Sequence, residues 1–314
     1  MPGQTIAEKI LSAKSGKKCM VGDIVVCAAD LILGTDGSTP MAIDTFERMG
    51  GQNIPNPERV LLSRDHYAPP TSNATLGYHA IMESFAATHN IELLEVGDGI
   101  SFQVAMETDR VRPGDLVIGA DSHTTTCGAL GAFATGIGSV DLAAALLTGK
   151  VWLRVPETKR VTLDETLPAG VSAKDVALDL VRRLGSNGAT YSALEFVGPV
   201  ADSLSVDGRK TISNMSVETG AKVGVFPVHG QESDRYARLA EEIHIDCSLL
   251  EPCVALPHDP ANGVPTSDVI GTAIDWVFLG TCCGGFAEDL RDAVRILDDG
   301  GGIATGVTVV VTPP

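Results

Sequence analysis

Two aspartate–histidine pairs are the residues of this sequence best suited to proton chemistry. Asp65 is followed directly by His66, and only Ser122 separates Asp121 from His123. A neighbouring carboxylate holds an imidazole in one tautomer and raises its pKa, which suits proton delivery to a leaving hydroxyl or the orientation of a metal-bound water. The alternative is that these are ordinary surface loop residues, and finding two such pairs weakens it.

Each pair follows a short apolar run of strand length. The run 60–62 precedes the first pair and the run 116–119 precedes the second. In open α/β sheets, ligands bind in the crevice beyond the carboxyl ends of the strands. We therefore expect both pairs to converge on one pocket.

The rest of the chain repeats an alternation of strands and helices. Helical spacing of apolar residues predicts helices at 5–15, 41–49, 75–88, 174–184 and 288–297. Apolar or alternating runs predict further strands at 24–28, 151–155, 160–163, 276–280 and 308–312. The run 24–28 is continuous, as in strands buried on both faces of a parallel sheet, and 34–40 is predicted to be a turn-rich loop. This pattern predicts an α/β protein with mainly parallel sheets and a subdomain boundary near residue 150, dividing it into 1–150 and 151–314.

Two further features carry charge in unusual settings. Glu195 is a lone carboxylate in an apolar stretch, either buried with a charged or donor partner or at a strand edge facing water. The segment 209–222 is polar but has the spacing of a helix start, and its alternative is a solvated helix. Neither feature reveals its role without neighbours.

The seven cysteines include one vicinal pair, Cys282-Cys283, at a strand-to-turn junction followed by glycines. Glycines let backbone N–H groups approach a sulfur or a cluster closely. A [4Fe–4S] cluster with one exposed iron needs three thiolates, and the chain contains no C-x-x-C. The other five cysteines are interpreted as buried small hydrophobes or incidental loop thiols.

Composition excludes several classes of protein. The chain has 314 residues, 44% of them hydrophobic, and a formal charge of −17, so it is an ordinary globular protein of about two domains. An acidic surface disfavours nucleic acid and anionic membranes as partners. The odd cysteine count, with no leader-like opening and no long apolar run, predicts a reduced, cytoplasmic protein.

Several stretches of the sequence resemble the aconitase superfamily, in particular the large subunits of 3-isopropylmalate dehydratase and homoaconitase. The resemblance runs over essentially the whole chain. Its strongest part is the stretch 114–139, which contains the second Asp/His pair. It is supported by 3–10, by Asp65-His66 with Pro69 and Asn73, by 214–222 and by 275–290.

This resemblance implies an aconitase-like fold of stacked three-layer α/β/α subdomains and a hydro-lyase that dehydrates and rehydrates a small hydroxy-di- or tricarboxylate, such as 3-isopropylmalate in leucine biosynthesis. It implies a [4Fe–4S] cluster acting as a Lewis acid and a small swivelling-domain subunit in a separate chain. By position, the active-site groups would be Asp65, His66, Asp121, Ser122, His123 and Glu195, and Cys282 would be the first cluster ligand.

The sequence also departs from the family pattern at positions of chemistry. Phe102 stands where the family has a histidine, and the stretch 281–286 loses an asparagine and an arginine. The chain stops before the family's C-x-x-C, so two of three expected cluster ligands are not in it.

Three interpretations fit these departures. The chain is a portion of a large subunit, or a shortened homologue that works without a cluster, or a non-catalytic binding or partner subunit. The first two predict a hydro-lyase.

Overall fold

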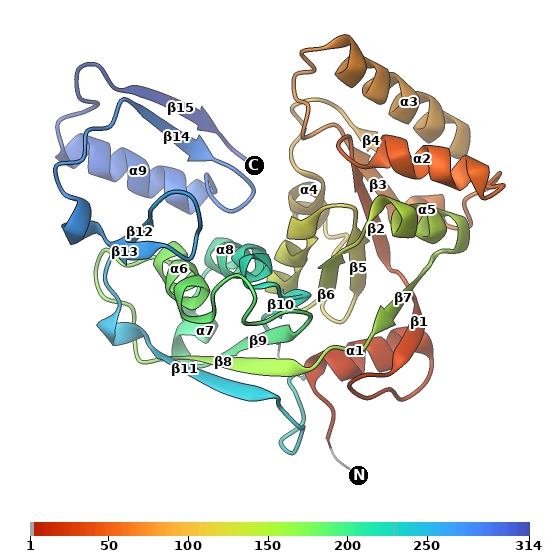
Figure 1. Ribbon diagram of the computed structural model, residues 1–314, viewed down its shortest axis with the longest axis horizontal. Coiled ribbons are helices and arrows are strands. Elements are labelled where there is room, and N and C mark those ends of the chain that lie inside the picture. Colours follow the sequence, from red (N-terminus) through yellow and green to blue (C-terminus); the bar gives the residue numbers. More distant parts are fainter. Residues whose placement is uncertain (1–2, 229) are drawn as a thin grey trace.

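The computed structural model describes residues 3–228 and 230–314, and Figure 1 shows them as an α/β protein. The α-helices are α1 (Ile6–Ser15), α2 (Thr39–Arg48), α3 (Asn73–His89), α4 (Ser101–Glu107), α5 (Ser139–Thr148), α6 (Ala173–Leu184), α7 (Pro199–Ser203), α8 (Val206–Met215) and α9 (Ala287–Asp299). Short 3-10 helices are η1 (Pro57–Arg59), η2 (Ser122–Leu130), η3 (Ser216–Thr219), η4 (Cys247–Leu249) and η5 (Thr266–Val269).

Within residues 3–228 and 230–314, the strands form two larger sheets and three two-stranded ones. They are β1 (Ile24–Ala28), β2 (Leu31–Thr35), β3 (Val60–Ser63), β4 (Glu92–Leu94), β5 (Leu116–Gly119), β6 (Phe133–Gly136), β7 (Lys150–Arg154), β8 (Thr158–Asp164), β9 (Ala193–Val197), β10 (Val223–Val225), β11 (Glu241–Asp246), β12 (Cys253–Ala255), β13 (Gly263–Pro265), β14 (Trp276–Gly280) and β15 (Thr308–Thr312). Both larger sheets are entirely parallel, which confirms the predicted class.

The first sheet has the strand order β4-β3-β2-β5-β6 and is covered on both faces. Alternate strand residues point to opposite sides, so Ile32 and Ile118 join a core with α1, α2, α3 and α5. Leu33 and Val117 point the other way, into a core with α4 and η2. This is the expected three-layer α/β/α arrangement, and it aims the ends of β2, β3 and β5 at one edge.

The second sheet has the order β10-β9-β8-β11 and packs against α6 and α8. Val161 and Phe196 from the strands meet Val176 and Ile212 from the helices in its core. The segment expected to be either a helix start or a solvated helix is therefore largely a buried helix, α8.

Two details of residues 24–40 differ from the sequence predictions. The strand β1 is not in a parallel sheet: it pairs antiparallel with β7, and Ile24 and Val26 are exposed while Val25 and Cys27 are buried. The stretch 31–35, whose end lies in the predicted loop 34–40, forms β2, a fully buried strand at the centre of the sheet. Burial of a continuous apolar run thus depended on which neighbours the fold supplied. The predicted boundary near residue 150 stays a prediction.

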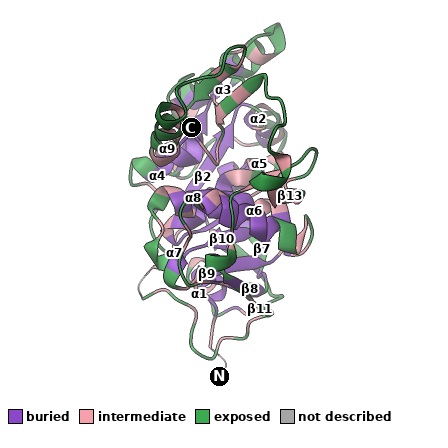
Figure 2. Ribbon diagram, turned by 90° about the vertical axis from the view of Figure 1, so that its left-hand side faces the viewer, coloured by how far each residue is buried: buried purple, intermediate pink, exposed green. Residues whose placement is uncertain are grey.

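The C-terminal unit consists of β14, α9 and β15. Its two strands pair in parallel, and none of the residues of α9 is buried. Figure 2 shows the contrast between buried central elements, such as α6 and α8, and α9. Within the described residues, no helix combines the length and the apolar character needed to cross a membrane.

Candidate active site

The first Asp/His pair lies at the end of β3 and is hydrogen bonded as expected. Asp65 Oδ1 lies 2.8 Å from His66 Nδ1, and its Oδ2 accepts from Ser63 Oγ at 2.7 Å and from the Ser101 amide at 3.0 Å. The carboxylate is nearly buried and the imidazole about half exposed. The hydrogen bond that His66 donates to Asp65 raises the pKa of His66 to about 9, so the ring is a cation at neutral pH.

The second pair brings Asp121 between two imidazoles. Asp121 caps η2, because its Oδ1 accepts the His123 amide at 2.7 Å. Its Oδ2 lies 3.5 Å from His66 Nε2, and its Oδ1 lies 3.7 Å from His123 Nδ1. The structure therefore brings the two pairs together at the carboxylate of Asp121, while their expected place in one pocket stays a prediction. Ser122 lies beside them, with its Oγ 3.4 Å from His123 Nδ1.

Glu218 joins this group although the sequence analysis did not single it out. Its Oε1 lies 3.3 Å from His123 Nε2, so the second imidazole has a carboxylate on each side. Glu218 comes from η3, just after α8, and is far away in sequence. The only signal for it was a carboxylate inside the segment 214–222, which carries part of the family resemblance.

Close packing holds η2 in place, together with Asp121 and His123 at its start. A Cβ at Gly136 in β6 would lie 2.8 Å from the Asp121 carbonyl oxygen, and one at Gly128 would lie 1.9 Å from the Gly224 carbonyl oxygen. Only glycine lets these backbones approach so closely. In addition, Asn214 of α8 donates to Thr126 Oγ1 at 2.9 Å. Both sheets therefore hold the loop that carries Asp121 and His123.

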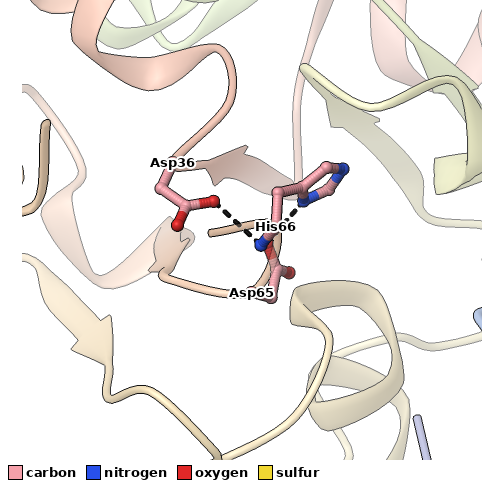
Figure 3. Close-up of side chains that lie close together, drawn as sticks. All are labelled: Asp36, Asp65 and His66. Carbon is pink, nitrogen blue, oxygen red and sulfur yellow. Dashed lines mark hydrogen bonds and ion pairs between the residues drawn. The ribbon is translucent and has the colours of Figure 1, made fainter. Parts of the chain in front are cut away.

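The loop after β2 contributes two further polar contacts. Ser38 Oγ donates to the Ala120 carbonyl at 2.8 Å, next to Asp121. On the other side, Asp36 accepts the His66 amide at 2.9 Å (Figure 3). The sequence analysis missed Asp36, although it follows a buried strand just as Asp65 and Asp121 do.

Asp36, Asp65 and His66 are also the one group of His, Cys, Asp or Glu side chains, within residues 3–228 and 230–314, that is compact enough to hold a metal ion. Their ligand atoms lie within 4.8 Å of one another. However, every carboxylate oxygen in the group already accepts a hydrogen bond from the protein. The arrangement is that of a hydrogen-bonded network that positions His66.

The structure does not bring Glu195 into this group. Glu195 is fully buried in β9, so it does not face water. Its Oε2 accepts from Arg160 at 3.1 Å and its Oε1 from the Ser233 amide at 3.2 Å. These contacts supply the charged partner that a buried carboxylate needs, and an active-site role for Glu195 stays an untested prediction.

Phe102 and a nearby cavity define the surroundings of the site. Phe102 lies in α4, fully buried in the core against η2, where it supplies apolar packing and no proton. A cavity of about 450 Å³ borders the Asp121 loop and is lined by Ser122, Trp152 and Lys222, among others. Burial lowers the pKa of Lys222.

The vicinal cysteines follow β14 and face different cores. Cys282 packs against the core that contains Phe102 and Cys127, and its carbonyl accepts from Asn214 at 3.2 Å. Cys283 packs against the core of the second sheet, and its Sγ lies 3.0 Å from Lys174 Nζ. A hydrogen bond between the two thiols, assisted by Lys174, lowers the pKa of Cys283, while the same bond and burial raise that of Cys282.

These residues do not suffice for a three-thiolate cluster. In the part of the chain that the structure describes, the group able to hold a metal contains no cysteine. Burial raises the pKa of each of the five remaining thiols, as is typical of unreactive cysteines packed in a core. Cys282 alone combines the family position with a place beside η2 and Asn214.

Paired imidazoles and carboxylates at the strand ends of an α/β/α fold are groups that acid–base enzymes use. Comparisons with known proteins point to a family of enzymes. The aconitase family (aconitate hydratase) matches residues 8–238. The chain is 43% identical to the 3-isopropylmalate dehydratase large subunit 1 of Methanopyrus kandleri, over 99% of this chain and 78% of that protein.

Two further relatives show the same extent of similarity. The large subunit of Moorella thermoacetica and the large subunit 2 of Archaeoglobus fulgidus, both named for 3-isopropylmalate dehydratase, are 42% identical over 99% of this chain and 78% of their own lengths. The chain belongs to the aconitase family and is a hydro-lyase of that family.

Proposed function

We propose that this chain is the large subunit of a two-chain hydro-lyase that dehydrates and rehydrates a small hydroxy-di- or tricarboxylate, 3-isopropylmalate in leucine biosynthesis. The observation that carries the proposal is the position of Asp121 between His66 and His123, which brings two imidazoles to one carboxylate. The names of the relatives support the choice of substrate. The non-catalytic alternative is not favoured, because relatives at 42–43% identity over 99% of this chain are named as dehydratase subunits.

His66 is the general acid in this proposal. Dehydration of a hydroxy-acid breaks a C–O bond and a C–H bond on the neighbouring carbon. Hydroxide is a poor leaving group unless a proton reaches it, and the carbon-bound proton goes to a base that this proposal assigns to the small subunit. Asp65 keeps the His66 ring protonated, and Nδ1 is tied to that carboxylate, so Nε2 is the atom that delivers the proton. In rehydration, the same ring takes the proton back from the incoming water.

His123 and Ser122 orient the reacting groups. Glu218 holds Nε2 of His123, while Nδ1 faces Asp121 and Ser122. The cavity lined by Ser122 and Lys222 offers a hydroxyl and an amine to a substrate carboxylate. The cluster of the family enters no step here, since the described residues of this chain do not hold it by themselves.

The partner and the compartment are part of the same proposal. The relatives are named as large subunits, and a small subunit with the swivelling domain would complete the enzyme. All seven cysteines are free thiols, which is the state expected in the reducing cytoplasm.

The test is turnover by the complex of this chain with the small subunit of a relative. The acids 3-isopropylmalate, homocitrate and citrate are assayed, with and without added iron and sulfide, by the ultraviolet absorbance of the new double bond. We expect turnover of 3-isopropylmalate, and a loss of about 10²–10⁴-fold in kcat in His66→Gln and His123→Gln. His244, which is paired with Asp164 on the exposed strand β11, provides the matched control: His244→Gln retains activity. Absence of turnover in every arm, or full activity in His123→Gln, contradicts the proposal.

A further inference from the structure

We propose that Asp36 and His79 form a buried positioning pair that fixes the loop carrying His66 and thereby the direction in which the imidazole of His66 points. This goes beyond the proposed function, on which it rests only in taking His66 as the acid. Neither residue touches the reacting atoms, so both are positioning residues.

Asp36 makes three hydrogen bonds with its two oxygens. Its Oδ1 accepts the His66 amide at 2.9 Å, and its Oδ2 accepts the Tyr67 amide at 3.0 Å and Nε2 of His79 at 2.8 Å. The Asp36 side chain is completely buried. A buried carboxylate is costly unless it is fully hydrogen bonded, so its presence here indicates that the loop geometry depends on it.

His79 connects this carboxylate to a rigid helix. It lies in α3 and is itself buried, with the side chain 7% exposed. The same helix places Met82, Phe85 and Ala86 in the core of the first sheet. The imidazole therefore ties the loop of His66 to an element that cannot move without disrupting that core.

The consequence is visible at the ring of His66. Figure 3 shows Asp36 directed at the backbone of His66 while the ring of His66 extends away from Asp36. With the two amides fixed, Nδ1 meets Asp65 at 2.8 Å and Nε2 comes within 3.5 Å of Asp121.

The charged groups around the pair are few. His66 is faced by Asp65 from the end of β3, by Asp36 from the end of β2 and by Asp121 from the end of β5. Asp36 is faced by His66 and by His79 of α3. Removing His79 leaves every carboxylate near His66 in the chain, and the loss of a nearby cation would raise the pKa of His66, so a fall in that pKa reports positioning and not charge.

The experiment measures the pKa of His66 by NMR on the full chain with ¹³C-labelled histidine, using His66→Gln to assign the signal. We expect the pKa to fall by about one unit or more in Asp36→Asn, which removes a nearby charge and an acceptor. It also falls in His79→Leu, and His79→Gln, which keeps an N–H donor, restores most of the wild-type value. Asp164→Asn, which breaks the exposed pair with His244, leaves the His66 pKa unchanged.

Two results would overturn the inference. The first is a folded His79→Leu variant, with a wild-type circular dichroism spectrum, whose His66 titrates as in the wild type. The second is a His79→Gln variant as perturbed as His79→Leu. If Asp36→Asn does not fold, the two His79 variants still decide. The measurement needs no substrate, so a positive result with an inactive enzyme would refute the proposed function alone.

Discussion

The first sheet and the C-terminal unit (β14, α9 and β15) differ in how completely their strands are covered. In the first sheet, helices cover both faces, and the carboxylates of Asp36, Asp65 and Asp121 accept hydrogen bonds within the chain. In the C-terminal unit, the two parallel strands are covered only in part. There, Trp276 and Phe278 stack on each other with centroids 5.8 Å apart and are 56% and 40% exposed.

The residues proposed for proton chemistry and those expected for a cluster differ in the same way. The carboxylates of Asp36, Asp65 and Asp121 all accept hydrogen bonds from other residues of this chain, which fixes the proposed acid–base residues in place. The thiols are not assembled: Cys282 has neighbours from η2 and α8, but the described residues bring no second and third thiol to it. Proton chemistry and cluster chemistry therefore place different demands on this chain.

The largest expected effect concerns the cluster. Purified anaerobically and supplied with iron and sulfide, this chain alone is expected to retain far fewer than the roughly four iron and four sulfide ions of a [4Fe–4S] cluster. Iron and sulfide analysis measures this, and Cys282→Ser serves as the control for adventitious iron. About four iron and four sulfide ions per chain, with the broad absorption near 400 nm that is typical of such clusters, would contradict the prediction and show that this chain holds a cluster by itself.

The next effect is in backbone protection. Hydrogen–deuterium exchange should be slower by about 100-fold or more in β2 and β5 than in β14 and β15, because local opening costs less where few apolar groups are buried. Mass spectrometry of peptides from the two regions gives the ratio. Equal protection in both would remove the contrast.

A matched pair of valines tests the same contrast by mutation. Val117 in β5 is fully buried and Val311 in β15 is 49% exposed. Val117→Ala should lower the free energy of unfolding by about 2 kcal/mol through lost burial and a cavity, and Val311→Ala by about 0.5 kcal/mol or less. Urea denaturation of the two variants supplies both numbers. A larger cost at Val311 would mean that the C-terminal unit is packed more tightly than its exposure indicates.

The smallest effect is the pH dependence of stability due to His66. Its pKa in the folded protein is about 9, against an ordinary value of 6.5, so the folded state binds the proton more tightly. The stabilisation is full below about pH 6.5 and is lost as the pH rises through about 9. Since the ring is half exposed, screening limits it to about 1 kcal/mol or less. The free energies of unfolding of His66→Gln and of the wild type, measured across this pH range, should converge at high pH. A constant difference between them would show that His66 is not stabilised by the carboxylates around it.

Much of the secondary structure followed from local patterns. The helix 5–15 was predicted from its apolar face and Gly16, and α1 ends there with Gly16 in the left-handed conformation. The run 276–280 was predicted as a strand and is β14. Two predictions near the N-terminus were wrong because they depended on neighbouring strands. The strand β1 pairs antiparallel with β7, and the first residues of the predicted loop 34–40 belong to the central strand β2.

The site was predictable in part, for the same reason. Asp65, His66, Asp121 and His123 are adjacent to strand ends in sequence, and parallel strands bring such ends together. Glu218 and His79 come from helices distant in sequence, so only packing shows that they contact the site residues. Glu195 stands out as a carboxylate in an apolar stretch, but the sequence does not reveal its partner, because Arg160 lies opposite it on the neighbouring strand β8.

By itself, the sequence determined the α/β class, the family and the two Asp/His pairs, because these depend on periodicity and on residues that are close together in the chain. The tertiary structure decided which carboxylate serves which imidazole, that Asp121 is shared, and that Asp36 and His79 support His66. These are contacts across 30 to 95 positions of sequence. No local pattern encodes such contacts, because they arise only when buried faces of separate elements pack together.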